Sequence, residues 1–355
     1  MGTTRYAVIG SGRMGQEHIS TLALIADAEI TALADTDAGM LAAAADLAGP
    51  GARTFDDSRD LLAADLADAL IIATPNHTHA EILLPALETG LPIMVEKPLC
   101  TTVEDCRRVI DAAAARRAPV WVAMEYRYMP PVARLVEEVR RGTVGRLRML
   151  AIREHRNPFL RKVGDWNRFS RNTGGTMVEK CCHFFDLMRH IIAAEPVRVF
   201  ASGAQDVNHL DERYDGETPD LVDNAYVVVD FETGARALLD LCMFAEASRD
   251  REEIAAVGDR GKVECGVPSS TLLIGRRDAM ELETETVFVD PAVLAAGDHH
   301  GSTYFEHLAF LAALDGGKPE VGLDDGLWAV AMGVAAERSI KERRPVTMAE
   351  LGLGA

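Results

Sequence analysis

The chain has 355 residues, of which 48% are hydrophobic and 26% charged, and its formal net charge at pH 7 is −18. This length and composition are typical of a two-domain globular protein with a large core. The acidic charge disfavours nonspecific nucleic-acid binding, since the phosphate backbone is negative as well. The sequence shows no signal peptide, no apolar run of membrane-spanning length and no C-x-x-C pair among its six cysteines. We therefore expect a cytoplasmic protein with reduced thiols and no membrane partner.

The first motif is the turn Gly10-Ser11-Gly12-Arg13-Met14-Gly15, which follows the apolar run 6–9 and opens into a helical pattern. Its G-x-G-x-x-G spacing between a strand and a helix is typical of dinucleotide-binding turns. The first glycine permits the tight turn, the second lets the backbone approach a pyrophosphate, and the third lets the helix lie close to the strand. The free N–H groups at the helix start would face the phosphates. We assign cofactor binding to Gly10, Gly12, Arg13, Met14 and Gly15.

The second strand-like run, 29–34, ends in Asp35. A carboxylate at this position can hydrogen-bond the ribose hydroxyls of NAD, and it would repel the 2′-phosphate of NADP. The alternative is an ordinary strand–helix turn with a solvated aspartate. The agreement of strand, spacing and acid favours NAD as the cofactor.

Strands and helices alternate over the first part of the chain, with apolar runs at 7–9, 30–34, 69–73, 93–96 and 120–123. This alternation predicts a Rossmann domain, a doubly wound parallel sheet, over residues 1–123. Later segments show hairpin signals, with runs at 226–231 and 235–241 and at 253–257 and 262–265, and helical patterns at 303–314 and 324–341. We therefore expect residues 124–355 to form an α+β domain with a large, mainly antiparallel open sheet.

Polar residues gather directly after the predicted parallel strands, where ligands of such sheets bind. Besides the glycine turn and Asp35, they lie in the segments 74–79, 96–98 and 125–128. We assign further cofactor contacts to Thr74, Asn76, His79, Glu96, Lys97 and Glu125, and a substrate contact to Arg127.

Lys97 lies between Glu96 and Pro98. Proline keeps the preceding residue out of the helical region, so Lys97 is expected in an extended or turn conformation at the carboxyl edge of the sheet. There its ammonium group can bind the oxygen of an alcohol or ketone, or join a proton relay. The alternative is a surface lysine paired with Glu96.

The segment from Thr176 on predicts a helix that carries Glu179, His183, Asp186 and His190 on one stripe. His183 can act as general base, because a histidine side chain ordinarily titrates near working pH, and Glu179 can orient it or a substrate hydroxyl. The alternative is a solvated charged face with a satisfied core histidine. We expect no metal site at Cys181-Cys182-His183, since successive helix residues point apart and no second ligand pair has suitable spacing.

A basic segment with interleaved aromatic residues, 153–171, lies between these motifs. Its hydrogen-bonding side chains suit a polyhydroxylated ligand, and its arginines suit an anionic substituent. The alternative is a solvated basic loop or a subunit contact. We assign substrate contacts here to His155, Asn157, Trp166 and Arg168, in addition to Lys97, Glu179 and His183.

Together these motifs resemble the glucose–fructose oxidoreductase / inositol dehydrogenase / rhizopine catabolism (Gfo/Idh/MocA) family over nearly the whole chain. The segments that carry the resemblance are the glycine turn with Asp35, Thr74-Pro75-Asn76-His77-Thr78-His79, Glu96-Lys97-Pro98, Gly174-Gly175 through Asp186, His300-Gly301, Tyr304 and Arg344-Pro345-Val346. The resemblance implies Lys97 as the catalytic lysine and His183 as the catalytic base. It departs at Glu179, where the family's usual residue is aspartate. The pair His155 and Asn157 is similar to a hydroxyl-binding pair of inositol dehydrogenases.

The resemblance implies an NAD-dependent dehydrogenase that oxidises a secondary hydroxyl of a sugar, sugar derivative or cyclitol, and a homo-oligomer, dimer or tetramer, assembled through the open sheet. One alternative is a glycoside hydrolase or lyase that recycles tightly bound NAD. Another is a non-catalytic sensor of NAD or a metabolite.

Overall fold

The computed structural model describes residues 2–314 and 317–354, which form two compact units. The first unit holds the residues up to Glu125 together with Lys162–Gly164 and Asp290–Leu327. The second holds Tyr126–Arg161, Asp165–Val289 and the residues from Trp328 on. Within the described ranges, none of the helices combines the length and apolarity that a membrane crossing requires.

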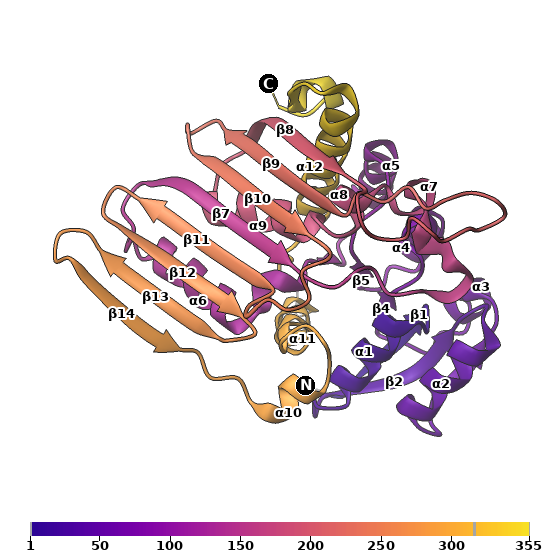
Figure 1. The fold of residues 1–355 in the computed structure, drawn as a ribbon. Helices are drawn as coiled ribbons and strands as arrows, with labels where there is room; N and C mark the ends of the chain where they lie inside the picture. Colours follow the sequence, from indigo (N-terminus) through magenta and orange to yellow (C-terminus); the bar gives the residue numbers. More distant parts are fainter. Residues whose placement is uncertain (1, 315–316, 355) are drawn as a thin grey trace. The chain divides into compact units, whose positions relative to one another are not determined.

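The first unit contains a six-stranded parallel sheet in the order β3-β2-β1-β4-β5-β6 (Figure 1). Its strands are β1 (Thr4–Ile9), β2 (Ala28–Ala34), β3 (Arg53–Phe55), β4 (Ala69–Ile72), β5 (Ile93–Glu96) and β6 (Val120–Ala123). This order and the parallel pairing confirm the predicted doubly wound sheet. The sequence missed β3, because this edge strand is three residues long and lacks the continuous apolar run that marks the others.

Helices connect these strands, and two further helices of this unit come from late in the sequence. They are α1 (Arg13–Leu22), α2 (Ala38–Ala48), α3 (Ser58–Leu62), η1 (Asn76–Thr78), α4 (His79–Glu88), α5 (Val103–Ala113), α10 (Pro291–Ala295) and α11 (Ser302–Leu314). Buried partners hold α11 here: the Trp121 indole of β6 donates to Glu306 at 3.0 Å, and Phe310 packs against the Tyr6 ring of β1. The predicted division assigned all of 124–355 to the second domain, whereas these contacts join residues 290–327 to the first unit.

The second unit contains a nine-stranded sheet in the order β14-β13-β12-β11-β7-β10-β9-β8-β15. Its strands are β7 (Leu147–His155), β8 (Pro196–Ala204), β9 (Asn224–Phe231), β10 (Arg236–Cys242), β11 (Glu252–Gly258), β12 (Gly261–Val267), β13 (Thr271–Arg276), β14 (Glu281–Thr286) and β15 (Val346–Thr347). β7 and β10 pair in parallel and the other neighbours pair antiparallel, so the predicted, mainly antiparallel sheet is confirmed.

Helices cover one face of this sheet, as Figure 1 shows for α6, α9 and α12. The remaining elements associated with this unit are α6 (Pro130–Arg140), α7 (Ser170–Thr173), α8 (Thr176–Glu179), α9 (Cys182–Ile192), α12 (Leu323–Glu342), η2 (Glu125–Tyr128), η3 (Val163–Arg168) and η4 (Met348–Leu351). A buried hydroxyl links α12 to the sheet, since Ser339 Oγ accepts the Ala201 N–H of β8 at 2.9 Å. In β8 and β9, the covered face is built from alternate buried residues.

The helix predicted from Thr176 is interrupted, which corrects the expectation of one continuous stripe. α8 ends at Glu179 and α9 begins at Cys182. Between them, the Cys181 N–H bonds the Thr176 carbonyl instead of the next carbonyl along the chain. The periodicity of the sequence could not show this break, because all of the residues around it are buried. Lys180, at the break, binds Glu154, which lies far away in the sequence.

Candidate active site

The glycine turn leaves room for a phosphate group beside the start of α1. Gly10 has a φ of 98° and lies against the Ala73 backbone, and a Cβ on Gly15 would clash with the Gly10 carbonyl oxygen. A Cβ placed on Gly12, by contrast, would meet nothing within 4 Å. The turn therefore fits the pyrophosphate of a dinucleotide, since the backbone is open where the phosphates approach and closed where the helix meets the strand.

Asp35, which directly follows β2, is hydrogen-bonded to this turn. Its carboxylate accepts the Ser11 N–H at 2.6 Å and the Asp37 N–H at 2.8 Å. The half-buried side chain thus stands at the carboxyl end of the sheet next to the glycine turn, where the ribose of NAD is expected. Arg13, also assigned to the cofactor, is exposed and pairs with Asp298.

The segments after β4 and β5 are tied together by His79. Its ring nitrogens lie 2.8 Å from the Pro98 carbonyl oxygen and 3.0 Å from the Thr74 carbonyl oxygen. Burial lowers the pKa of His79, and the hydrogen bonds to the two carbonyls oppose that effect. Asn76 is buried in the same segment. His79 therefore holds the backbone of the assigned cofactor residues together.

Behind Lys97, a buried chain of polar side chains reaches back to α1 and α11. The Glu96 carboxylate accepts the Lys97 N–H at 3.1 Å and lies 3.0 Å from His18 Nε2, and His18 Nδ1 lies 2.9 Å from His307 Nε2. Burial by itself raises the pKa of Glu96, but the hydrogen bond from His18 brings it below the usual value. Burial and the neighbouring His18 lower the pKa of His307. This chain fixes the backbone from which the half-buried Lys97 projects.

Four further polar side chains lie near the same end of the sheet. Glu17 accepts from His299 Nδ1 at 2.8 Å and from the Thr303 hydroxyl at 2.9 Å. The other nitrogen of His299 lies 4.0 Å from the buried Glu125 carboxylate. Burial raises the pKa of Glu125 to about 7, and the charges of His299 and Lys97 oppose that rise. Sequence reasoning missed Glu17, His18, His299 and His307, since nothing in their local pattern distinguishes them from surface residues or ordinary core histidines.

In the second unit, the Gly174-Gly175 turn starts α8 against a buried carboxylate. The Glu337 side chain of α12 lies so close to Gly175 that a Cβ there would clash with it, and it accepts the Met177 N–H at 3.0 Å. Burial raises the pKa of Glu337 to about 7, and the Met177 hydrogen bond opposes that rise. The glycine, with a φ of 90°, is thus required both by backbone conformation and by this contact.

The two assigned groups of this segment, Glu179 and His183, are both buried, with exposed fractions of 3% and 2%. The His183 ring stacks on the Tyr126 ring, with centroids 4.1 Å apart and planes 10° apart. Asp186, one turn after His183, binds Arg127, whose Nε lies 2.6 Å from its carboxylate. Arg127 is therefore engaged by a buried ion pair, and sequence reasoning missed the contact between Tyr126 and His183.

The residues assigned to substrate in the basic segment are held by protein partners. His155 follows Glu154 on β7, so it faces the opposite side of the sheet, where its Nε2 lies 3.1 Å from Asp240. Arg168 is buried and donates to Glu212 at 2.9 Å. The Asn157 amide donates to the Pro158 carbonyl at 3.1 Å, and Trp166 is half-buried in η3. Their contacts with a substrate stay predictions.

The assigned residues fall into both units. Those of the first unit are Gly10, Gly12, Arg13, Met14, Gly15, Asp35, Thr74, Asn76, His79, Glu96, Lys97 and Glu125; those of the second are Arg127, His155, Asn157, Trp166, Arg168, Glu179 and His183. The structure brings members together within each unit, and the action of Lys97 with His183 stays a prediction.

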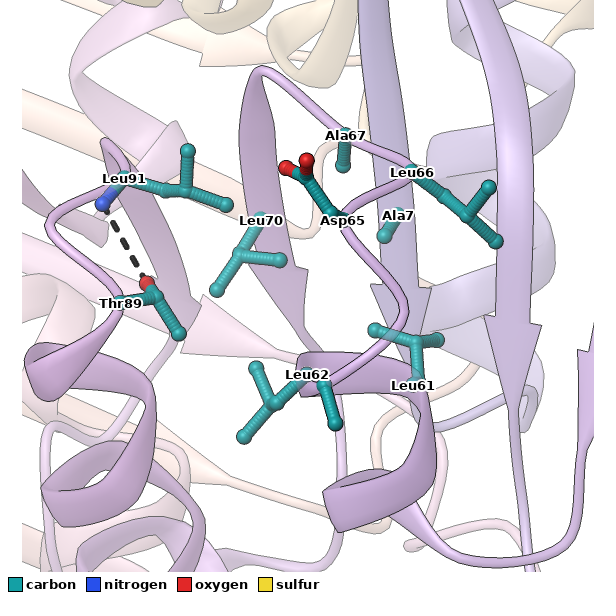
Figure 2. Close-up of a pocket in the computed structure, with 10 residues that line it drawn as sticks. Ala7, Leu61, Leu62, Asp65, Leu66, Ala67, Leu70, Thr89 and Leu91 are labelled. Carbon is teal, nitrogen blue, oxygen red and sulfur yellow. Dashed lines mark hydrogen bonds between the residues drawn. The ribbon is translucent and has the colours of Figure 1, made fainter.

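A small pocket lies at the opposite end of the first sheet. Figure 2 shows it between α3 and the segments that lead into β4 and β5, lined by Leu62, Asp65, Leu70, Thr89 and Leu91 among others. Its volume is about 180 Å³ and its lining is mostly apolar. Ligands of doubly wound sheets bind at the carboxyl ends of the strands, so this pocket is not the candidate site. In the part of the chain that the structure describes, no group of three or more His, Cys, Asp or Glu side chains is arranged to hold a metal ion.

Two family models match the chain, and both describe oxidoreductases. The model "Oxidoreductase family, NAD-binding Rossmann fold" matches residues 4–124, and the model "Oxidoreductase family, C-terminal alpha/beta domain" matches residues 136–348. Both belong to the Gfo/Idh/MocA models.

Similar proteins cover most of the chain. Inositol 2-dehydrogenase 3 of Saccharopolyspora erythraea is 31% identical over 271 residues, which are 76% of this chain and 75% of that protein. Myo-inositol 2-dehydrogenase of Thermotoga maritima is 26% identical over 98% of this chain and 99% of its own. Among solved structures, a probable dehydrogenase from Thermotoga maritima has a TM-score of 0.80 and 26% identity, with 98% of this chain and 99% of that chain covered.

The position of Asp35 predicts the choice between NAD and NADP. Replacing Asp35 by serine together with Thr36→Arg removes the charge that repels a 2′-phosphate and adds a cation that can bind it. We expect the ratio of kcat/KM for NAD to that for NADP to fall by on the order of 10²-fold. Steady-state kinetics with both cofactors measure it, with Thr36→Arg alone as the control. If the unaltered protein uses both cofactors equally, the assignment of Asp35 as the residue that selects NAD over NADP is wrong.

The burial of Glu337 predicts a pH-dependent cost in stability. Because the folded pKa of about 7 exceeds the ordinary value of 4.5, the unfolded chain releases this proton first, and stability falls as pH rises between these two values. Glu337→Gln removes the titration and can still accept the Met177 N–H. We expect the variant to gain up to about 3 kcal/mol in free energy of unfolding, relative to the unaltered protein, between pH 4.5 and 7.

Chemical denaturation at several pH values measures this gain. The matched control is Glu342→Gln on the same helix, whose carboxylate is exposed and ion-paired, and which is not expected to gain stability as pH rises. If the free energy of unfolding changed with pH equally in Glu337→Gln and in the unaltered protein, Glu337 would be ionised in the folded state throughout this range.

Proposed function

Because the chain belongs to the Gfo/Idh/MocA oxidoreductase family, we propose that it oxidises a secondary hydroxyl of a sugar, sugar derivative or cyclitol. It is an NAD-dependent oxidoreductase of CH–OH groups. The relatives named inositol 2-dehydrogenase support a cyclitol as the first substrate to test. The observation that carries the proposal is the buried Glu96–His18–His307 chain, which holds Lys97 at the cofactor end of the parallel sheet.

In the proposed reaction, bound NAD supplies the acceptor for the hydride that leaves the substrate carbon. Lys97 binds the hydroxyl oxygen and stabilises the negative charge that develops on it. His183 accepts the hydroxyl proton, which is the usual task of a histidine that acts as general base near neutral pH. Glu179 orients either the imidazole or a neighbouring substrate hydroxyl.

The assigned substrate residues divide into two groups under this proposal. Arg127 and Arg168 are each held by a buried or partly buried carboxylate, which supports a role in shaping the site. His155, Asn157 and Trp166 keep part of their surface exposed, which leaves them accessible to a substrate, although His155 is so from the face of β7 opposite to Glu154. Alanine variants of the second group should therefore change KM for the polyol.

Formation of free NADH from a panel of sugars and cyclitols tests the function. A dehydrogenase accumulates NADH in step with substrate consumed. A hydrolase or lyase that recycles bound NAD releases product without net NADH, and a sensor binds NAD or metabolite without any turnover. Either of these two results would reject the proposed reaction.

Lys97 and His183 are predicted to act on the same hydroxyl. Lys97→Met and His183→Asn should each lower kcat by roughly 10²-fold or more, the scale expected for loss of a polarising or acid–base group, with little change in NAD affinity. The double variant should lose less than the product of the two single losses, because groups that act as a unit are not additive.

Steady-state kinetics and NAD titration by fluorescence check this expectation. The control is Lys341→Met, an exposed lysine of α12 whose loss should leave kcat unchanged. Near-normal turnover in Lys97→Met would contradict a shared role. So would a double variant whose loss of kcat equals the product of the two single losses.

We further propose that two copies associate through the open face of the nine-stranded sheet. Three neighbouring apolar side chains are exposed there: Phe200 by 43%, Tyr226 by 62% and Val228 by 39%. Val228 lies directly opposite Phe200 on β8, and burying such a row removes apolar surface from water.

Val228→Lys should therefore weaken the oligomer by placing a charge in its apolar contact. Light scattering coupled to size exclusion measures the mass, and the control is Leu24→Lys, an exposed apolar residue of the first unit with an exposed fraction of 42%. A monomeric unaltered protein, or equal masses for Val228→Lys and the unaltered protein, would reject this face as the interface.

A further inference from the structure

We propose that Tyr126 and Lys180 are positioning residues that hold the His183 imidazole in one orientation and favour its uncharged form. The inference rests on the proposed function of His183 as base. It goes beyond that function because it assigns a task to two buried residues that the proposed reaction does not use.

The first observation is the stack between Tyr126 and His183. The centroid distance of 4.1 Å and the angle of 10° describe two rings lying flat against one another. The Phe184 ring meets the Tyr126 ring edge-on, at 5.7 Å and 72°. Since Tyr126 and His183 are 3% and 2% exposed, water does not compete for this contact. The imidazole can therefore rotate only if the phenol ring moves as well.

The second observation is that the phenol ring is fixed at its far end. Lys180 Nζ donates to the Tyr126 oxygen at 2.6 Å, and the Tyr126 hydroxyl donates to Glu252 at 3.3 Å. The phenol oxygen therefore has both a donor and an acceptor as partners, which sets the plane of the ring. Lys180 also lies 3.0 Å from Glu154, so the ammonium group that anchors Tyr126 is itself anchored on β7.

A fixed imidazole matters because a general base has to meet its proton along one direction. Misplacement of a catalytic group by about 1 Å can cost 10²-fold in rate. The stack leaves the ring edge, where both nitrogens lie, clear of Tyr126, while the ring face is occupied. Tyr126 thus restrains the orientation of His183 without covering its basic atoms.

The charge of Lys180 acts on the same ring. Its Nζ lies 4.7 Å from the Tyr126 centroid and 5.5 Å from the Phe184 centroid, so a buried cation flanks the stack. A cation at this place opposes a second positive charge on the imidazole, which favours the neutral, proton-accepting ring.

Other charges surround the stack and limit this effect. Among the described residues of the second unit, the nearby carboxyl groups include Glu154, Glu179, Asp186, Glu252 and Glu337. The cations besides Lys180 include Arg127, Arg156 and Arg251, whose Nε lies 3.8 Å from Glu252. Arg127 neutralises Asp186, and Lys180 with Arg156 neutralises Glu154. Burial and the charge of Glu154 raise the pKa of Glu252 to about 7, so it carries little charge below neutral pH. Loss of Lys180 alone therefore leaves the surroundings of His183 more negative.

The experiment combines kinetics with histidine NMR on the full-length protein. Tyr126→Leu removes the stack, Tyr126→Phe keeps it but loses the anchor, Lys180→Met removes the charge and Lys180→Arg keeps it. We expect kcat to fall roughly 10- to 10²-fold in Tyr126→Leu and less than about tenfold in Tyr126→Phe, with KM nearly unchanged in both. Lys180→Met should move the acidic limb of the pH profile of kcat/KM to higher pH, and Lys180→Arg should restore it.

The NMR measurement decides the inference independently of turnover. In protein labelled with ¹³C-histidine, the His183 signal is identified by its loss in His183→Asn. We expect a ring-current shift of that signal in the unaltered protein and in Tyr126→Phe, its loss in Tyr126→Leu, and a higher His183 titration midpoint in Lys180→Met than in Lys180→Arg.

The outcomes separate the inference from the proposed function. If no polyol yields NADH but the NMR shifts appear as expected, the proposed function fails and the positioning of His183 stands. If Tyr126→Leu keeps both the shifted His183 signal and normal kcat, or if Lys180→Met and Lys180→Arg titrate alike, the inference is wrong. Equal losses of kcat and of melting temperature in Tyr126→Phe and Tyr126→Leu would also reject it, because they would show a purely structural role for Tyr126.

Discussion

The need to compensate charge inside the buried core is the constraint on which the candidate site residues of both units depend. A carboxylate as deeply buried as Glu96 is tolerated because His18 and a backbone N–H hydrogen-bond it. The same hydrogen bonds link β5 to α1 and, through His307, to α11. This chain of hydrogen bonds is one of the contacts that join a helix from late in the sequence to the first unit, and it includes the backbone N–H of Lys97.

The second unit meets this constraint with a different set of groups. The buried Lys180 ammonium has Glu154, Tyr126 and the neighbouring aromatic faces as its partners, while Asp186 is neutralised by Arg127. Pairing of this kind adds little to stability when compared with a well-packed apolar core. The effect that we propose for these pairs is on geometry. Their members come from several different elements, and together they restrict the position of the His183 ring.

Lys180 lies where the backbone departs from a regular helix. It occupies the junction between α8 and α9, and its side chain is directed to Glu154 of β7. The position before it, Glu179, holds a longer carboxylate than the aspartate expected from the family resemblance. Glu179 and Lys180 thus lie in the same turn between α8 and α9, close in sequence to His183, the catalytic base that the resemblance implies.

Elements whose signals are local could be predicted from the amino-acid sequence alone. Continuous apolar runs located β4, β5 and β6 nearly to the residue, and the glycine spacing located the cofactor turn, because these patterns follow from strand burial and from the space that a Cβ occupies. The sequence also singled out Lys97 and His183, which the chemistry of their neighbours makes conspicuous. The folded structure was needed to show that residues 290–327 join the first unit, that Arg127 and Arg168 bind carboxylates, and that Tyr126 stacks on His183. The physical reason is that the partners of a buried polar side chain lie far away in sequence, so no local pattern can reveal which groups will neutralise it.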